Sequence, residues 1–199
     1  MDKTMRMTVK TTAFAALLLF AGSGPAAAAV LPSENASIAE TGDGYRVTGS
    51  FDIRSSETNV WQTLADYGSL ANILSDLTES SVVDRSGNRI TVRQVISSKF
   101  LVFSRTVNLL IDVREHPFRE IDFSEISGCP FAVYKGSWTL EREAGGVRVT
   151  YRLRVSKGAL APVIFEKRLF LERARKTLSE MKREIDRRIA LKVSRAPSR

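Results

Sequence analysis

The sequence predicts an α+β domain: a seven-stranded, curved antiparallel sheet wrapped on a long C-terminal helix, with two short helices after the first strand. Three observations support this prediction. Segments between residues 45 and 156 alternate apolar and polar side chains, as half-buried strands do. Short turn-forming stretches separate six of these segments, which favours antiparallel hairpins. After Pro162 the apolar residues recur every three or four positions, which indicates an amphipathic helix.

The N-terminal residues have the features of a secretory signal peptide in the expected order. Lys3, Arg6 and Lys10 are followed by an uncharged apolar run over residues 13–21, and small residues precede a cleavage site just before Val30. A membrane anchor is the weaker alternative, because a span needs about 20 apolar residues. We therefore expect a periplasmic or secreted protein. The expected organisation is a signal peptide over residues 1–29, an N-terminal linker over 30–43, the folded domain over 44–193 and a basic C-terminal tail over 194–199.

Composition excludes several classes of site. Cys129 is the single cysteine and His116 the single histidine, so neither an intrachain disulfide nor a Cys/His zinc site can form.

The positive charge is concentrated at the C-terminal end of the sequence. Residues 30–166 hold 15 Lys/Arg and 17 Asp/Glu, whereas residues 167–199 hold 12 Lys/Arg and 4 Asp/Glu. This basic C-terminal segment is typical of a solvated helix face, or of a helix in weak contact with an anionic membrane surface. Nucleic acid is not an expected partner, because no basic–aromatic interleaving is present.

The elements follow from local patterns taken in chain order. Residues 45–53 alternate strictly and form the first strand. Ser55 or Ser56 is a suitable N-cap, with Glu57 in the first turn of a short helix, and residues 67–74 form a second. Six further strands are predicted over residues 77–84, 89–97, 102–115, 119–127, 131–142 and 147–156.

The last helix carries an apolar stripe that must be buried. Its members are Leu171, Ala174, Leu178, Met181, Ile185 and Ile189. The apolar face of the sheet is the only partner available for this stripe. A long helix lying across a curved antiparallel sheet is the helix-grip arrangement, in which a hollow commonly separates the helix from the sheet.

Three stretches of sequence support a family resemblance: residues 60–67 (VWQTLADY), 135–141 (KGSWTLE) and 150–153 (TYRL). With the order of elements, they make residues 45–189 resemble the START-like/SRPBCC superfamily. Within it, the chain is most similar to the polyketide cyclase/dehydrase group, which includes the coenzyme-Q-binding START-like proteins. The resemblance implies a cavity for a lipid, an isoprenoid quinone or a polycyclic compound. Some members of the group are cyclases, aromatases or hydrolases, and many only bind or carry a ligand.

Candidate cavity residues follow from the inward parity of the strands. A turn at Lys99 would pair Gln94 with Arg105 on a face that is otherwise apolar, and Glu125 falls on the inward face of the next strand. Three interpretations are open: a structural ion-pair network, a bulge that turns Arg105 outward, or a polar anchor for a ligand. The short turn at residues 144–146 also places Trp138 opposite Tyr151 on neighbouring strands. The expected ligand-binding residues are Val92, Gln94, Phe103, Arg105, Val107, Phe123, Glu125, Tyr134, Trp138, Tyr151, Phe165 and Leu169.

Catalysis is not the favoured function. His116 lies in a Glu-His-Pro turn, so we expect a surface residue there and no catalytic residue, cofactor or metal. The expectation is an exported protein that binds a hydrophobic or amphipathic small molecule between the sheet and the C-terminal helix. One alternative is a cyclase, dehydratase or hydrolase that uses Arg105, Glu125 and Tyr134 as acid–base groups. A second is an envelope interaction module without a ligand. Ligand identity and oligomeric state remain open.

Overall fold

The computed structural model describes residues 35–100, 103–128, 131–158 and 167–195, without the side chains of residues 98–100, 103–105 and 157. All of them belong to one compact unit, Pro32–Arg199. The elements are β1 (Asn35–Thr41), β2 (Gly44–Ile53), α1 (Glu57–Leu64), η1 (Tyr67–Ser69), α2 (Leu70–Ile73), β3 (Leu77–Ser86), β4 (Arg89–Phe100), β5 (Phe103–His116), β6 (Glu120–Glu125), β7 (Phe131–Glu143), β8 (Gly146–Lys157) and α3 (Lys167–Arg195).

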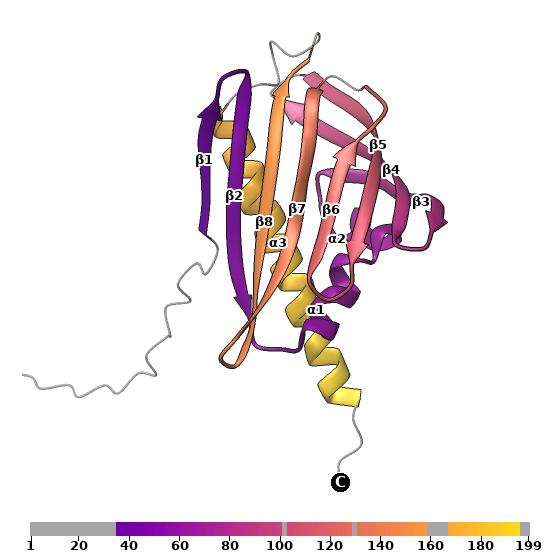
Figure 1. The fold of residues 1–199 in the computed structure, drawn as a ribbon, viewed down its shortest axis with the longest axis vertical. Helices are drawn as coiled ribbons and strands as arrows, with labels where there is room; N and C mark the ends of the chain where they lie inside the picture. Colours follow the sequence, from indigo (N-terminus) through magenta and orange to yellow (C-terminus); the bar gives the residue numbers. More distant parts are fainter. Residues whose placement is uncertain (1–34, 101–102, 129–130, 159–166, 196–199) are drawn as a thin grey trace, which may run out of the picture. The chain divides into compact units, whose positions relative to one another are not determined.

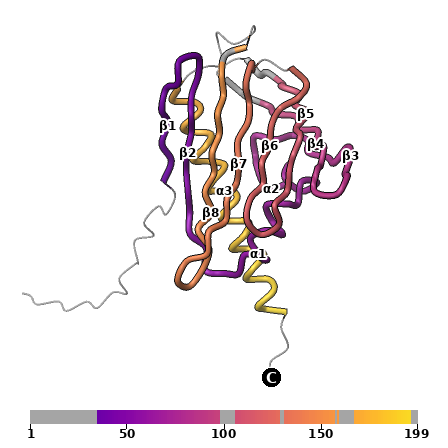
Figure 2. Tube along the Cα trace, viewed as in Figure 1, coloured from indigo at the N-terminus to yellow at the C-terminus, as the bar shows by residue number. Residues whose placement is uncertain are grey.

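The strands form one antiparallel sheet in the order β1-β2-β8-β7-β6-β5-β4-β3 (Figure 1). Helix α3 lies along one face of this sheet, behind it in the view of Figure 1, and Figure 2 follows the chain through the strands into that helix. The predicted α+β helix-grip fold, with short helices after the first long strand, is confirmed. Ser56 caps α1 as expected, because its hydroxyl accepts the main-chain N–H of Asn59 at 3.4 Å.

The sheet has one strand more than the sequence predicts. β1 occupies part of the segment that was expected to be a linker, and it pairs with β2 so that Ile38 lies opposite Val47. The apolar–polar alternation of β1 is weak. On the face of the strand turned toward α3, Ala36 and Ile38 are the only apolar side chains, and both are half-buried. Main-chain hydrogen bonds to β2 therefore stabilise β1, and such bonds leave no hydrophobic pattern in a sequence.

The register between β4 and β5 differs from the predicted one. A turn at Lys99 would pair Gln94 with Arg105, but Gln94 lies opposite Leu109 and Arg105 lies opposite Ser98. The difference is four positions, and an even shift keeps every side chain on its predicted face. Apolar–polar alternation fixes the face of a strand but not its register, and the residues around position 100 contain no strong turn signal.

Helix α3 packs against the sheet and the short helices, and five of its side chains are buried: Phe170, Ala174, Leu178, Met181 and Ile185. The stripe therefore begins at Phe170, since the predicted first member, Leu171, is only half-buried. Leu178 is completely buried over Gly49, where a side chain of any size would overlap it. A glycine in β2 thus lets the helix approach the sheet closely.

Candidate functional site

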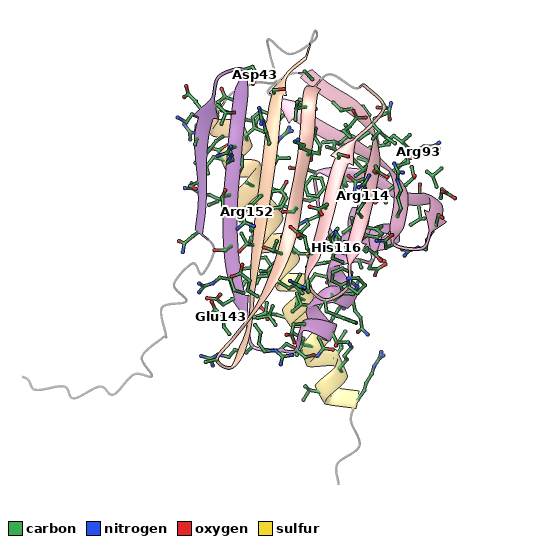
Figure 3. The ribbon with its side chains drawn as sticks, viewed as in Figure 1. Asp43, Arg93, Arg114, His116, Glu143 and Arg152 are labelled. Atoms are coloured by element: carbon green, nitrogen blue, oxygen red, sulfur yellow. The ribbon has the colours of Figure 1, made fainter. Side chains whose placement is uncertain are left out.

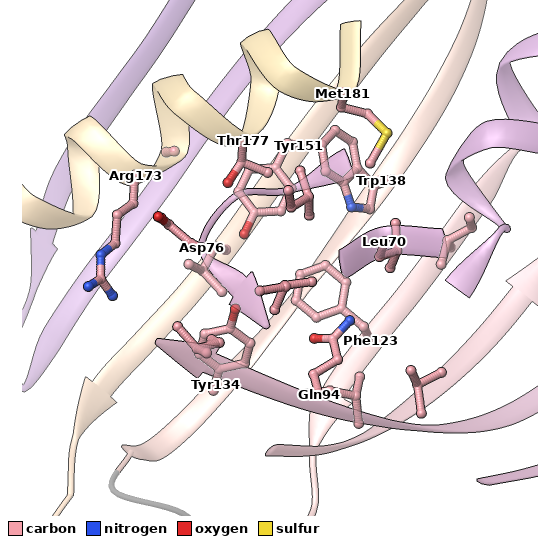
Figure 4. A pocket seen from close by; sticks show the side chains of 18 of the residues that line it. Leu70, Asp76, Gln94, Phe123, Tyr134, Trp138, Tyr151, Arg173, Thr177 and Met181 are labelled. Carbon is pink, nitrogen blue, oxygen red and sulfur yellow. The ribbon is translucent and has the colours of Figure 1, made fainter. Parts of the chain in front are cut away.

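A cavity of about 170 Å³ lies between the inner face of the sheet and α3 (Figure 4). Three groups of elements enclose it. Apolar side chains from α1, η1 and α2 close one side, inward residues of β4 to β8 form the floor, and α3 covers the top. Met181 from α3 and Leu70 from α2 are examples of the apolar lining (Figure 4). The cavity therefore lies where the sheet curves away from the helix.

Aromatic rings form one continuous wall of this cavity. Trp138 and Tyr151 lie directly opposite each other on β7 and β8, as the sequence predicts, with ring centroids 4.6 Å apart. Tyr151 also stacks on Phe123 of β6 at 6.1 Å, and Phe123 contacts Tyr134 at 6.2 Å. Rings at these separations attract one another beyond simple area burial. The wall therefore offers a rigid apolar surface to a flat or chain-like ligand.

Two tyrosine hydroxyls meet inside the cavity. Tyr134 and Tyr151 are hydrogen-bonded to each other, and Figure 4 shows both rings with their hydroxyl groups turned inward. Burial raises the pKa of both phenols, and the nearby Arg173 guanidinium opposes this for the pKa of Tyr134. Both groups therefore stay protonated at neutral pH, where they can donate or accept a hydrogen bond but cannot act as a base.

Gln94 supplies a third polar group. It extends from β4, and its amide is directed into the cavity (Figure 4). Within the described part of the chain, no hydrogen bond joins this amide to another residue. A half-buried amide is most stable when both its carbonyl and its NH₂ group have partners. Gln94 is therefore available to a polar group of a ligand.

The cavity mouth is bordered by contacts between α3 and the α2–β3 connection. Lys176 Nζ lies 2.6 Å from Asp76 Oδ1, and Glu180 accepts the main-chain N–H of Ser75 at 3.0 Å and also its hydroxyl. Asp76, Glu180 and Arg173 all line the cavity. This edge of the cavity is therefore charged and held by charge-assisted hydrogen bonds, whereas the rest of the lining is apolar except for a few neutral polar groups.

Tyr67 is a cavity residue that the sequence pattern did not predict. Its ring lines the cavity, and its hydroxyl donates to Glu115 Oε1 at 2.9 Å. Glu115 in turn pairs with Arg85 at 3.6 Å. Burial and the bond to Glu115 raise the pKa of Tyr67, so this phenol also stays neutral. The VWQTLADY stretch contains Tyr67, but the sequence does not show that its side chain faces the cavity, because this depends on how the short helices pack on the sheet.

Six of the twelve expected binding residues line the cavity: Val92, Gln94, Phe123, Tyr134, Trp138 and Tyr151. Val107 and Leu169 are half-buried and lie outside the lining. The side chains of Phe103 and Arg105, and the whole of Phe165, lie outside the described residues. Contact of any of these residues with a ligand remains a prediction.

Glu125 does not form the expected polar anchor in the cavity. It is the last residue of β6, and its carboxylate accepts the main-chain N–H groups of Ser127 at 2.6 Å and Gly128 at 3.1 Å, as well as the Ser127 hydroxyl. Burial would raise the pKa of Glu125, but these hydrogen bonds together lower it. The carboxylate therefore caps the turn after β6, because donors at the strand end satisfy it better than an apolar cavity would.

His116 is a surface residue, as predicted. It lies at the end of β5 with 55% of its side chain exposed, and its Nε2 is 3.5 Å from Asp122 Oδ2.

Among the described residues, no group of three or more His, Cys, Asp or Glu side chains could hold a metal ion. In the same residues, no helix is both long enough and apolar enough to span a bilayer. Cys129 lies outside the described residues.

The fold and the cavity define a START-like helix-grip protein, of the ligand-binding or cyclase type. Residues 56–182 match the sequence family described as polyketide cyclase/dehydrase and lipid transport. The chain belongs to this family, and the resemblance noted in the sequence is confirmed. No curated protein sequence matches the chain.

Solved structures show the same fold at low sequence identity. The STAR-related lipid transfer protein of Xanthomonas axonopodis superposes with a TM-score of 0.65 and 17% identity, over 77% of this chain and 94% of that one. The Zhui aromatase/cyclase of Streptomyces sp. R1128 gives 0.63 and 14%, over 72% and 94%. A START superfamily protein of Mycobacterium smegmatis gives 0.60 and 10%, over 72% and 99%. At these identities the likeness establishes the fold alone.

Proposed function

We propose that this protein binds a hydrophobic or amphipathic small molecule in the cavity between the sheet and α3. The observation that carries the proposal is the aromatic wall, Phe123, Trp138 and Tyr151, facing a space with few polar groups. Sites of this composition bind apolar bodies and use a few polar groups to orient them. The Xanthomonas relative is a lipid transfer protein by name, which supports a lipid-like ligand.

The polar groups narrow the chemistry of the ligand. Tyr134 and Tyr151 are neutral, and Gln94 offers both a donor and an acceptor. A carbonyl, hydroxyl or quinone oxygen suits such partners, whereas a buried anion would require a cation deep in the cavity. Arg173 lines the cavity on the α3 side, near Tyr134, where a charged headgroup would meet it. The ligand is thus an apolar body with a neutral oxygen inside and, if amphipathic, its polar end toward α3.

The size of the cavity sets a second limit. A volume of about 170 Å³ is close to the ~150 Å³ that holds a benzene ring and below the ~300 Å³ at which drug-sized sites begin. One ring or the end of one acyl chain therefore fits directly. A polycyclic compound or whole lipid requires α3 and the α2–β3 connection to separate, and the contacts of Lys176 and Glu180 would open first.

An enzymatic alternative rests on the structural likeness to the Zhui aromatase/cyclase. The acid–base set expected for it was Arg105, Glu125 and Tyr134. Glu125 is bound to the turn after β6, and the raised pKa of Tyr134 keeps that phenol protonated. Binding without proton transfer therefore agrees better with the described cavity. Turnover of a polyketide or an aromatic ester by the purified protein would reverse this preference.

Cavity binding can be tested with a blocking variant. Thr177 lines the cavity from α3, so Thr177→Phe should fill part of it, whereas Arg175→Phe places the same ring on the exposed side of the helix. We expect the wild type and Arg175→Phe to bind the fluorescent probe ANS and to release it to palmitate or a short-chain quinone. Thr177→Phe should bind at least about fivefold more weakly, the loss of about 1 kcal/mol of contact. Equal binding by all three proteins would refute the proposal.

Export is part of the same proposal. It rests on the charged start, the short apolar run and the small residues before Val30. We expect N-terminal sequencing of the protein from its native host to give a start within a few residues of Val30. An intact Met1 on a protein from the cytosolic fraction would contradict export.

A further inference from the structure

A second concave site lies on the outer face of the sheet, opposite α3. It is a hollow of about 460 Å³, and we call it the outer hollow. Most of its lining consists of charged, outward-facing residues of β2, β8, β7, β6 and β5, and Phe123, Gly136 and Leu153 of inward parity also border it. Figure 3 shows two of these, Arg152 and Arg114, on the face of the sheet that is turned away from α3. The cavity proposed above for a ligand lies on the other face.

Three cations cross the outer hollow in a single row. Arg46 on β2 lies directly opposite Arg154 on β8, and Arg154 lies directly opposite Lys135 on β7. All three side chains are exposed, and we call them the cation row. The Cβ atoms of residues directly opposite on neighbouring strands are about 5 Å apart, and like charges in that position destabilise a sheet. The row is therefore an unfavourable arrangement for the isolated chain.

Other cations on the same face have partners within the chain. Arg148 lies on the same strand as Arg154, and it binds Asp52 at 2.9 Å and Glu143 at 3.1 Å. In the described parts of the chain, no ion pair joins the cation row to a carboxylate. The two acids of the outer hollow are engaged elsewhere, because Asp112 binds Arg89 at 2.6 Å and Asp122 lies 3.5 Å from His116.

We propose that the outer hollow and its cation row dock an extended acidic segment of a partner protein. Alternate residues of a strand lie about 6.8 Å apart on one face. Arg152 and Arg154, two residues apart along β8, therefore have the spacing of carboxylates at every second position of an extended chain. Arg46 and Lys135 flank Arg154 on the two neighbouring strands. Guanidinium groups bind carboxylates through two parallel hydrogen bonds, and arginine is enriched at protein interfaces. The outer hollow is concave, so an extended peptide segment can enter it where a flat membrane surface could not.

A labelled peptide tests this docking directly. The probe is a fluorescein-labelled peptide of sequence Glu-Ser-Glu-Ser-Glu-Ser, and its control has Gln in place of Glu. We expect fluorescence anisotropy to show binding of the Glu peptide only, with affinity that falls as salt rises. The triple variant Arg46→Gln/Lys135→Gln/Arg154→Gln should bind about tenfold more weakly or worse. Arg148→Gln, which removes a paired cation from the same strand, should bind like the wild type.

Several outcomes would overturn the proposal. The first is equal binding of the Glu and Gln peptides, and the second is a loss of affinity in Arg148→Gln as large as that in the triple variant. The third is that the protein binds pyrophosphate, or vesicles with 25% phosphatidylglycerol, instead of the peptide, and that this binding is lost in the triple variant. Thermal unfolding at low salt provides an independent check on the charge argument. Because the substitutions relieve repulsion, the triple variant should melt no lower than the wild type. A lower melting temperature would show that the row stabilises the chain by itself, which contradicts the proposal.

Discussion

Glu184 holds Arg188, the residue that joins the C-terminal half of α3 to the connection between α1 and η1, so its removal has a calculable effect. Its carboxylate accepts hydrogen bonds from Arg187 Nε at 2.6 Å and from Arg188 Nε at 2.7 Å. Arg188 also donates to Asp66 at 2.9 Å, in the connection between α1 and η1. Only 15% of the Glu184 side chain is exposed. We predict that Glu184→Gln destabilises the fold.

The pKa of Glu184 gives the magnitude. The hydrogen bond from Arg187 and the contacts with Arg188 outweigh burial and lower this pKa from 4.5 to about 2. A fall of that size corresponds to about 3 kcal/mol of stability at neutral pH. Arg187 is 57% exposed, so solvent screening reduces the expected loss to about 2 kcal/mol. Because the folded pKa lies below the unfolded one, this stability is present above pH 4.5 and disappears as the pH falls toward 2.

Urea unfolding of both proteins at pH 7 and at pH 2.5 measures this contribution. The difference between wild type and Glu184→Gln should be about 2 kcal/mol at pH 7 and less than half of that at pH 2.5. Glu172→Gln is the matched control on the same helix, because among the described residues Glu172 pairs with the exposed Arg168 alone, at 2.8 Å. It should cost less than about 0.5 kcal/mol. Equal losses in the two variants, or a difference that does not change with pH, would refute the reasoning.

Three further predictions concern packing, the cavity and the surface. Gly49→Ala should cost about 1–3 kcal/mol in urea unfolding, because a Cβ there overlaps Leu178, and it should cost less in a Leu178→Ala background. Tyr134→Phe should cost about 1–3 kcal/mol by leaving the Tyr151 hydroxyl unpaired, and the double change with Tyr151→Phe should recover part of this. Vesicle co-sedimentation should show weak, salt-sensitive binding of α3 to anionic lipid alone, and equal binding to zwitterionic lipid would contradict it.

Fewer cations of α3 are free to contact an anionic membrane than the composition of this segment indicates. The sequence assigns a large positive excess to residues 167–199. Several of those cations have partners within the chain: Lys192 donates to Asn59 and Gln62, Lys176 pairs with Asp76, and Arg187 pairs with Glu184. Such exposed pairs are weak and a lipid surface can compete for them. Charge counts alone cannot distinguish free cations from paired ones, because the partners lie on elements far away in the sequence.

The spacing of the apolar residues along the chain was enough to predict most of the fold. The alternation in β2 and β8 and the three-to-four spacing in α3 identified the two layers, because burial on one face leaves that pattern in a sequence. β1 was missed, since main-chain pairing at an edge requires few apolar side chains. The register of β4 and β5 was wrong by four positions, since alternation is unchanged by an even shift.

The aromatic part of the cavity was equally accessible from the sequence. Trp138 and Tyr151 followed from the short β7–β8 turn, which fixes the register around it. Glu125 was wrongly expected in the cavity. Its position in the strand indicates an inward side chain, but the alternation pattern gives no information about the main-chain N–H donors at the end of the strand. Tyr67 and Asp76 were missed because short helices carry little periodicity. Their place in the cavity depends on tertiary packing that local patterns do not encode.

Gly136 makes the sheet a thin partition between two sites. The cavity on one face and the outer hollow on the other share Phe123 and Leu153 among their walls. A Cβ at position 136 would lie 2.6 Å from Phe123 Cζ, so the ring already rests against the backbone there. A ligand that moves this ring changes the wall of both sites at once. Any resulting coupling is necessarily reciprocal: occupancy of either face alters the affinity of the other by the same factor.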